Sequence, residues 1–137
     1  MALDIDAIEQ NIVAYLSPPL MALNASVGTT EADALNQVVT TANVFVNYAG
    51  MVRDEADTFN RPKIATFNLN IVVRVKDLRS HKVAFPICEK IRELLEFYAP
   101  TAAFVQSLRF ESERIDLQFV ADGIWLFIQD WTSTVLF

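Results

Sequence analysis

The segment 64–75, IATFNLNIVVRV, alternates apolar and polar side chains along most of its length. Successive side chains of a β-strand point to opposite faces, so the pattern predicts a strand with two different sides. Strands usually have ~5–6 residues, and this one is about twice as long. Its apolar side is formed by Phe67, Leu69, Ile71, Val73 and Val75. Any fold for this chain must therefore supply a layer that covers one side of a long strand.

The composition favours contacts between subunits. The chain has 137 residues, which fits one domain spanning 1–137, and 53% of them are hydrophobic. The mean hydropathy is +0.27, which is high for a small monomer. A domain of this size keeps a large share of its surface exposed, so we expect part of the apolar surplus to be covered by other subunits.

Charge and apolar run lengths exclude several classes of protein. The longest apolar runs, such as 124–128, fall well short of the ~20 residues of a membrane-spanning helix. Asp4, Asp6 and Glu9 stand where a signal peptide would carry positive charge, which indicates a cytoplasmic protein that does not enter a membrane. The net charge of −6 argues against tight nucleic-acid binding, because such binding needs a basic surface.

Two helices are expected. The first covers 5–16 and ends at Pro18 and Pro19, with Asp6 and Glu9 resembling a capping box. The second covers 85–100, with Pro86 in its first turn and Pro100 at its end. The stretch 20–41 has no sustained period, although 31–39 would make a short helix capped by Thr30. The predicted inner core pairs the long strand with this second helix through Phe67, Leu69, Ile71, Val73, Ile87, Ile91 and Leu94.

The remaining segments read as strands and connectors. Residues 51–62 form a polar loop, 76–82 a basic connector and 121–123 an Asp-Gly turn. Strands that follow one another in sequence usually pair antiparallel. We therefore predict an α+β fold, a mainly antiparallel sheet of four to five strands with two main helices packed on one face. The expected strands are 41–50, 64–75, 104–110, 114–120 and 124–137.

Side chains suited to catalysis are scarce. His81, the single histidine, sits in a basic connector without a nucleophile motif, and Cys88 lies beside the apolar stripe of the second helix. Glu111 and Glu113 could hold a cation or a raised-pKa acid, but neighbouring arginines favour an ion network. No glycine-rich phosphate loop is present. We expect no enzymatic activity, no cofactor and no metal.

Four segments give the chain a family likeness. They are VFVNYAG at 44–50, FNLNIVVRV at 67–75, ICEKIRELL at 87–95 and DGIWLFIQD at 122–130. In order, spacing and character they resemble the tail terminator proteins of tailed bacteriophages, particularly the Mu-like phages with contractile tails. The likeness runs from about Val44 to the end of the chain, with the N-terminal helix also in place.

This resemblance implies a non-enzymatic virion protein. Such a subunit closes into a hexameric ring at the head-proximal end of the tail, after assembly in the host cytoplasm. The ring caps the tail tube, stops its polymerisation and offers a docking surface to the neck or connector protein, with the sheath as a further possible partner. DNA passes through the lumen without specific binding, and an acidic lumen would let it slide by repulsion.

Two groups of residues are candidate interface positions. The first is the loop after the strand at 41–50, which would contact the tube or a neighbouring subunit, or else lie solvated at the surface. The second is the tryptophan pair of the last strand, which would pack in a core or at an interface. The candidates are Arg53, Asp54, Glu55, Asp57, Arg61, Trp125 and Trp131.

Three alternatives stay open. The chain could be another neck or tail-completion subunit, or a related injection-system cap. It could be a small α+β binding module that dimerises through its apolar strand. It could also be an enzyme that uses Glu111, Glu113 or His81. The mass in solution separates a ring from a dimer, and a pocket that joined those three side chains would favour the enzyme.

Overall fold

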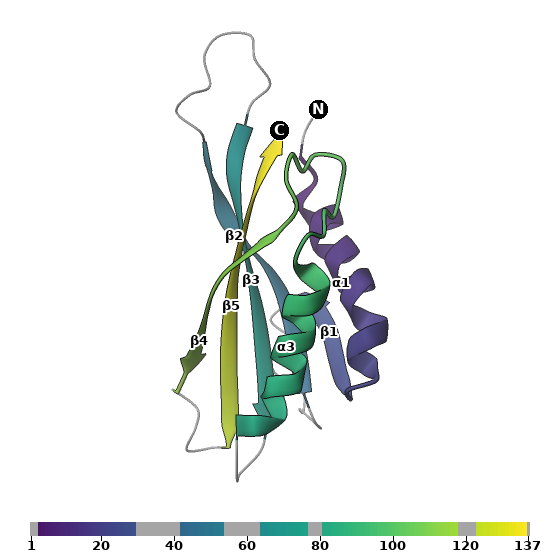
Figure 1. Ribbon diagram of the computed structural model, residues 1–137, viewed down its shortest axis with the longest axis vertical. Coiled ribbons are helices and arrows are strands. Elements are labelled where there is room, and N and C mark those ends of the chain that lie inside the picture. The colour runs from purple at the N-terminus through teal and green to yellow at the C-terminus, as the bar shows by residue number, and fades with distance from the viewer. Residues whose placement is uncertain (1–2, 30–41, 54–63, 77–80, 118–122, 137) are drawn as a thin grey trace.

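The computed structural model describes residues 3–29, 42–53, 64–76, 81–117 and 123–136. Five strands form one sheet in the order β1-β2-β3-β5-β4, and two α-helices pack on one of its faces (Figure 1). Only β1 and β2 run parallel, so the predicted α+β class with a mainly antiparallel sheet is confirmed. The elements are α1 (Ile5–Met21), β1 (Ala25–Thr29), β2 (Ala42–Arg53), β3 (Ile64–Lys76), η1 (His81–Val83), α3 (Ala84–Leu95), β4 (Arg109–Asp116) and β5 (Ile124–Leu136).

The central strand β3 is the long alternating segment predicted from the sequence. It pairs with β2 on one side and with β5 on the other, each over most of its length. Every second side chain is buried, which confirms the prediction of a one-sided strand. The predicted core residues are all buried except Leu94, which is half-buried and packs against the core. The inner row of β3 is Ala65, Phe67, Leu69, Ile71, Val73 and Val75.

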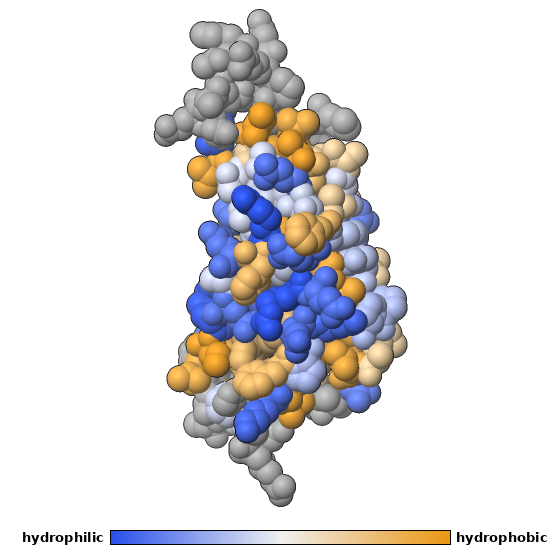
Figure 2. All heavy atoms as spheres, viewed as in Figure 1, coloured by the Kyte–Doolittle hydropathy of each residue, from blue (hydrophilic) through white to orange (hydrophobic). Residues whose placement is uncertain are grey.

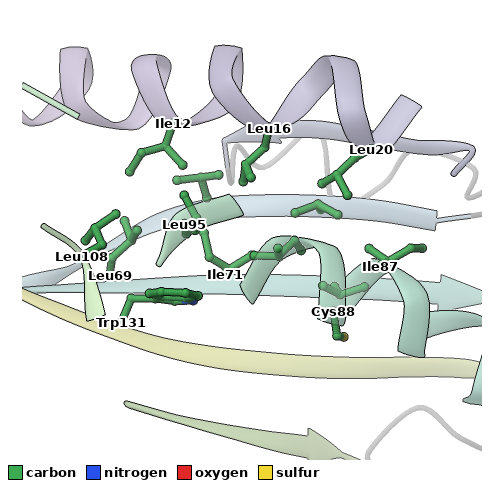
Figure 3. Packing of buried hydrophobic residues seen from close by; sticks show 14 of the residues in the cluster. Ile12, Leu16, Leu20, Leu69, Ile71, Ile87, Cys88, Leu95, Leu108 and Trp131 are labelled. Carbon is green, nitrogen blue, oxygen red and sulfur yellow. The ribbon is translucent and has the colours of Figure 1, made fainter. Parts of the chain in front are cut away.

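Both helices place an apolar stripe on this face of the sheet, α1 over β1 and β2 and α3 over β3. In α1 the stripe follows three- and four-residue spacing, so its side chains point from one side of the helix into the sheet (Figure 3). Helix α3 does the same beside it and adds Cys88, which is buried (Figure 3). None of the described helices has the length and apolar character needed to cross a bilayer. The stripes are Ile8, Ile12, Leu16 and Leu20 in α1, and Ile87, Cys88, Ile91 and Leu95 in α3.

Helix α1 differs from its prediction at both ends. Its N-cap is Asp4, whose Oδ1 accepts a hydrogen bond from the N–H of Ala7 at 3.0 Å. The helix continues through Pro18 and Pro19 to Met21 instead of ending at the prolines. Proline removes helical hydrogen bonds, yet the last turn carries Leu20, which is fully buried. Burial of Leu20 at the end of the stripe accounts for the continuation, because tertiary packing outweighs local propensity.

Glu9, predicted to close a capping box, instead binds strand β2. Its Oε2 accepts a hydrogen bond from the N–H of Tyr48 at 2.9 Å. The register of β2 against β3 shifts between Tyr48 and Gly50, and Gly50 has φ +115°. The bulge takes up the extra residue, and pairing with β3 resumes beyond it. β2 therefore continues to Arg53, and the prediction that it ends at Gly50 was wrong.

Strand β1 was not predicted. Its five residues, ASVGT, are small and show no clear alternation, yet they pair with β2 in parallel register. A parallel neighbour needs a crossover connection, which short-range pattern does not reveal. The helix predicted for 31–39 lies outside the described residues, as does most of the predicted loop at 51–62.

The region after α3 also departs from expectation. The helix ends at Leu95, before Pro100, because Glu96 leaves the helical conformation with ψ 127°. Phe97 then adopts a left-handed conformation with φ +68°, and the N–H of Tyr98 closes the turn on the C=O of Leu95 at 3.0 Å. The predicted strands at 104–110 and 114–120 are replaced by the single strand β4, and Phe104 makes only an isolated bridge to Val135. The stretch before β4 is irregular, with Phe104 and Leu108 buried under it.

The bond between Glu9 and Tyr48 gives a first testable prediction. Glu9→Ala leaves the partly buried N–H of Tyr48 without its acceptor, and losing such a partner costs about 1–3 kcal/mol. We expect urea denaturation to show that loss. The matched control is Gln10→Ala on the exposed side of α1, which should stay within about 0.5 kcal/mol of the parent protein. Equal stability of the two variants would contradict the role assigned to Glu9.

Candidate functional site

Strand β4 forms one edge of the sheet and is the most exposed strand described. It pairs with β5 on one side, and no described strand pairs with its other side. Every residue of β4 is exposed except Phe110 and Asp116, which are half-buried. An open edge presents backbone N–H and C=O groups to which another chain can add. This edge is the first candidate for a surface that binds a second polypeptide.

A bulge marks the beginning of this edge. The register against β5 shifts between Phe110 and Ser112. Glu96 Oε2, just beyond the end of α3, accepts a hydrogen bond from the N–H of Phe110 at 3.2 Å. Bulges bend a strand and interrupt its regular edge. The regular part of the open edge is therefore Ser112 to Asp116.

A polar network fastens β4 to helix α3. Arg92 Nη1 lies 2.7 Å from Glu113 Oε1, and Gln129 Nε2 donates to the same oxygen at 2.9 Å. Gln129 is fully buried; it also donates to the C=O of Cys88 at 3.0 Å and accepts from Trp131 Nε1 at 3.1 Å. Fully satisfied buried polar groups hold one arrangement of their neighbours. The edge is thus fixed in place by its own subunit.

A second polar group ties the sheet together on the face away from the helices. Asp130 accepts from Ser112 Oγ at 2.9 Å and forms an ion pair with Arg114. With its amide nitrogen turned towards Asp130, Asn70 donates to the other carboxylate oxygen at 2.8 Å. These contacts join β3, β5 and β4 across the strands. Two charges of the edge strand, on Glu113 and Arg114, are therefore satisfied within the subunit.

Apolar side chains gather at the far end of β4, and we call Val83, Phe85, Ile115 and Leu117 the lower patch. All four are exposed, with Leu117 at 63%. Ile115 stands opposite Phe127 in the sheet, and the ring of Phe85 packs edge-on against Phe127 with centroids 6.1 Å apart. Figure 2 shows hydrophobic groups at both ends of this face with a hydrophilic band between them. Exposed apolar groups collected at a strand edge are typical of a protein interface.

A groove of about 390 Å³ lies elsewhere on the molecule, where the end of α1 meets the beginning of α3. Its apolar wall includes Pro19, Leu23 and Pro86. Its charged rim comes from α3, with Glu89, Lys90 and Glu93. Lys90 Nζ lies 3.8 Å from Glu93 Oε2, so this lysine offsets part of the negative charge. The groove is open and apolar with an acidic rim.

The predicted interface residues differ in position and exposure. Arg53 is exposed at the end of β2, whereas Asp54, Glu55, Asp57 and Arg61 lie outside the described residues. Trp125 is half-buried and packs against the core. Trp131 is 1% exposed, with its ring inside the core (Figure 3). Trp131 therefore exposes almost no surface for a direct contact; it stands opposite Phe110 of β4 and donates a hydrogen bond to Gln129.

The two glutamates considered for chemistry have different surroundings. Glu113 forms an ion pair with Arg92 and accepts a hydrogen bond from Gln129, whereas Glu111 is exposed on the bulged part of β4. His81 begins η1, and its side chain lies outside the described set. Within the described ranges, no group of three or more His, Cys, Asp or Glu side chains could hold a metal ion. The nearby arginine that neutralises Glu113 is Arg92 of α3, not Arg109 or Arg114 as the sequence suggested.

Sequence reasoning missed the lower patch. The sequence predicted a strand at 114–120 but gave no assignment of its apolar side chains, and Ile115 and Leu117 are both exposed. A signal was present, since five of the eight residues in RFESERID are charged, and charge of this density is typical of an edge strand. The sequence placed Phe85 at the start of the second helix but did not indicate whether its side chain would be buried or exposed.

Comparison with known proteins gives a match of fold. No family model and no curated protein matches the chain. Among solved structures, a chain of the "Virion of native gene transfer agent (GTA) particle" superimposes with a TM-score of 0.65 at 14% sequence identity. The match covers 96% of this chain and 93% of that chain. At this identity the likeness shows a shared fold over nearly the whole length of both chains.

Cys88 gives a second prediction. Burial, and then the nearby Glu113 carboxylate, raise the pKa of its thiol to about 12, from about 9 when exposed. Between these values the unfolded chain has lost the proton and the folded chain still holds it, so stability falls as pH rises, by up to about 1.4 kcal/mol per pH unit. Urea denaturation at pH 8 and pH 10 should show a smaller drop for Cys88→Ala than for the parent protein. Equal drops in the two proteins would contradict this assignment.

Proposed function

We propose that this chain is a structural subunit of a phage-like virion particle, and more narrowly a tail terminator. The single observation that carries the proposal is the fold match to a chain of a gene transfer agent virion, which spans nearly all of both chains. The residue pattern that resembles the tail terminators of contractile-tailed phages supports the narrower role. In this role the protein caps the tail tube, stops its polymerisation and presents a docking surface to the neck or connector.

The proposed subunit contact uses the open edge of β4. A hexameric ring needs head-to-tail contacts, in which two different surfaces of each subunit meet. The edge from Ser112 to Asp116 and the lower patch supply one such surface. Covering Ile115 and Leu117 would bury apolar surface that the single chain leaves in water. This burial is the proposed source of the affinity between subunits.

The remaining parts of the proposal concern partners. The segment that begins at Arg53 is a candidate contact for the tube or a neighbouring subunit, with Asp54, Glu55, Asp57 and Arg61. Sheath contact is a further expectation. DNA would pass the lumen without specific binding, because a chain of net charge −6 repels phosphates. No step of this role requires catalysis, a cofactor or a metal.

A neck or tail-completion subunit is the second candidate. The matched structure is described as a whole virion, and a component of the neck would fit that description equally well. The two roles differ in what the ring contacts. Labelling of purified particles with an antibody to this chain, viewed by electron microscopy, should mark the junction of tail tube and neck. Label on the neck alone would favour the second candidate, and particles without label would overturn the proposal.

The β4 contact gives a third prediction. Ile115→Lys places a charge in the middle of the lower patch, where the side chain is exposed in the single chain, so the fold should be retained. We expect self-association, measured by sedimentation velocity across a concentration series, to weaken about tenfold, which corresponds to about 1.4 kcal/mol. Gln10→Lys adds the same charge on the exposed side of α1 and should associate like the parent protein. If both variants associate like the parent, β4 is not part of the contact between subunits.

A further inference from the structure

Phe97 combines two features that are both unfavourable in a single chain. Its φ is +68°, in the left-handed region, and its side chain is 82% exposed. Non-glycine residues with positive φ are uncommon, and a bulky side chain there is strained. The only other such residue among those described is Asn24, a type that adopts this conformation readily. Strain of this kind, when retained, points to a functional reason.

The fold requires the chain reversal at this position but does not require phenylalanine. The N–H of Phe97 donates to the C=O of Leu108 at 3.3 Å, and the N–H of Leu108 donates to the C=O of Tyr98 at 2.8 Å. These bonds involve backbone atoms alone, so glycine would make the same reversal without strain. The aromatic ring therefore adds nothing to the turn itself, and an outside contact is the remaining use for it.

The position of Phe97 connects it to the proposed interface. Leu108, its backbone partner, directly precedes β4, and Glu96 beside it binds the N–H of Phe110 in β4. Phe97 therefore stands next to the first residue of the strand, Arg109, which is exposed. The surface around Phe97 is an aromatic side chain flanked by a positive charge.

The groove between α1 and α3 has the complementary character. Its wall of Pro19, Leu23 and Pro86 is apolar, and its rim carries Glu89, Glu93 and Lys90. Lys90 lies 3.8 Å from Glu93, so the rim keeps one net negative charge. At about 390 Å³ it lies in the range of pockets that accept ring-sized groups. The groove lies at the beginning of α3, whereas Phe97 follows its end, so a single chain carries the two surfaces on different parts of its body.

We propose that Phe97 of one copy inserts into the α1–α3 groove of the next copy, with Arg109 facing Glu89 and Glu93. This inference rests on the proposed function, because it specifies the head-to-tail contact of the ring. Each copy contributes one aromatic anchor and one groove, and such unlike surfaces produce rings or filaments instead of two-fold dimers. A buried aromatic anchor in a pocket is typical of the residues that dominate binding energy.

The first experiment compares Phe97→Gly with Val105→Gly, which removes another exposed side chain from the same irregular segment. Phe97→Gly should melt at the same temperature as the parent or higher, because glycine relieves the strain. Its self-association, measured by sedimentation velocity, should weaken at least tenfold, while Val105→Gly associates like the parent. Parent-like association of Phe97→Gly would overturn the inference.

A mixing experiment tests the direction of the contact. Ala22→Arg fills the groove with a bulky cation at an exposed lining position and leaves Phe97 intact. Phe97→Gly has the opposite defect, with an empty anchor and an open groove. At concentrations where the parent associates, each variant alone should associate at least tenfold more weakly, whereas an equimolar mixture should form dimers and stop there, since only one intact contact can form. A mixture that stays monomeric, or that forms larger rings, would overturn the inference.

A charge exchange tests the predicted rim. Arg109→Glu should weaken association about tenfold, and the triple variant Arg109→Glu, Glu89→Arg, Glu93→Arg should restore it. The parent protein separates this inference from the proposed function. If the parent and all these variants form rings, the proposed ring is retained and the proposed Phe97 contact is wrong. A parent that stays monomeric at every concentration, alone and with particle tail tubes, would remove both.

Discussion

The inner row of β3 is the constraint on which the rest of the structure depends. Its side chains are fully or nearly fully buried in one core with the stripe of α3, which lies over β3, and the stripe of α1, which lies over β1 and β2. Because both helices occupy one face, the sheet keeps a second face and two edges that the described helices do not cover. Burial of one row on a central strand therefore determines which surfaces remain for contact with other chains, and β4 is the more exposed of the two edges.

Both irregularities of the sheet are satisfied by glutamates outside the strands. Glu9 of α1 binds the N–H of Tyr48 at the bulge of β2, and Glu96 after α3 binds the N–H of Phe110 at the bulge of β4. A bulge leaves backbone groups without their ladder partners, and a buried group of that kind is costly. Each helix is thus tied to the sheet by a polar bond as well as by its apolar stripe.

Sequence pattern was informative where burial follows a simple period. The alternation of β3 and β5 and the spacing in α1 and α3 located the core, since each of these elements has one fully covered side. The pattern failed where packing between distant segments decides the outcome. Burial of Leu20 extends α1 through two prolines, and β1 forms only because β2 pairs with it in parallel. The turn that contains Phe97 ends α3 earlier than the sequence predicted. For the candidate site, the charge density of RFESERID indicated an edge strand, but no local signal could show that Ile115 would be left uncovered, because that depends on strand order. Trp131 was an interface candidate by residue type, yet its position opposite Leu69 on the central strand places it in the core.

The network around Gln129 has a consequence for how copies of this chain can meet. It fastens β4, through Glu113, to Arg92 of α3 and Gln129 of β5, and both would lose this partner if the strand were peeled away. Gln129 would keep its bonds to Cys88 and Trp131. A visiting strand can therefore add to the outside of β4 but cannot easily take its place beside β5. In the proposed ring, copies would join as intact subunits, strand exchange between them would be suppressed, and each subunit would be recovered unchanged on dilution.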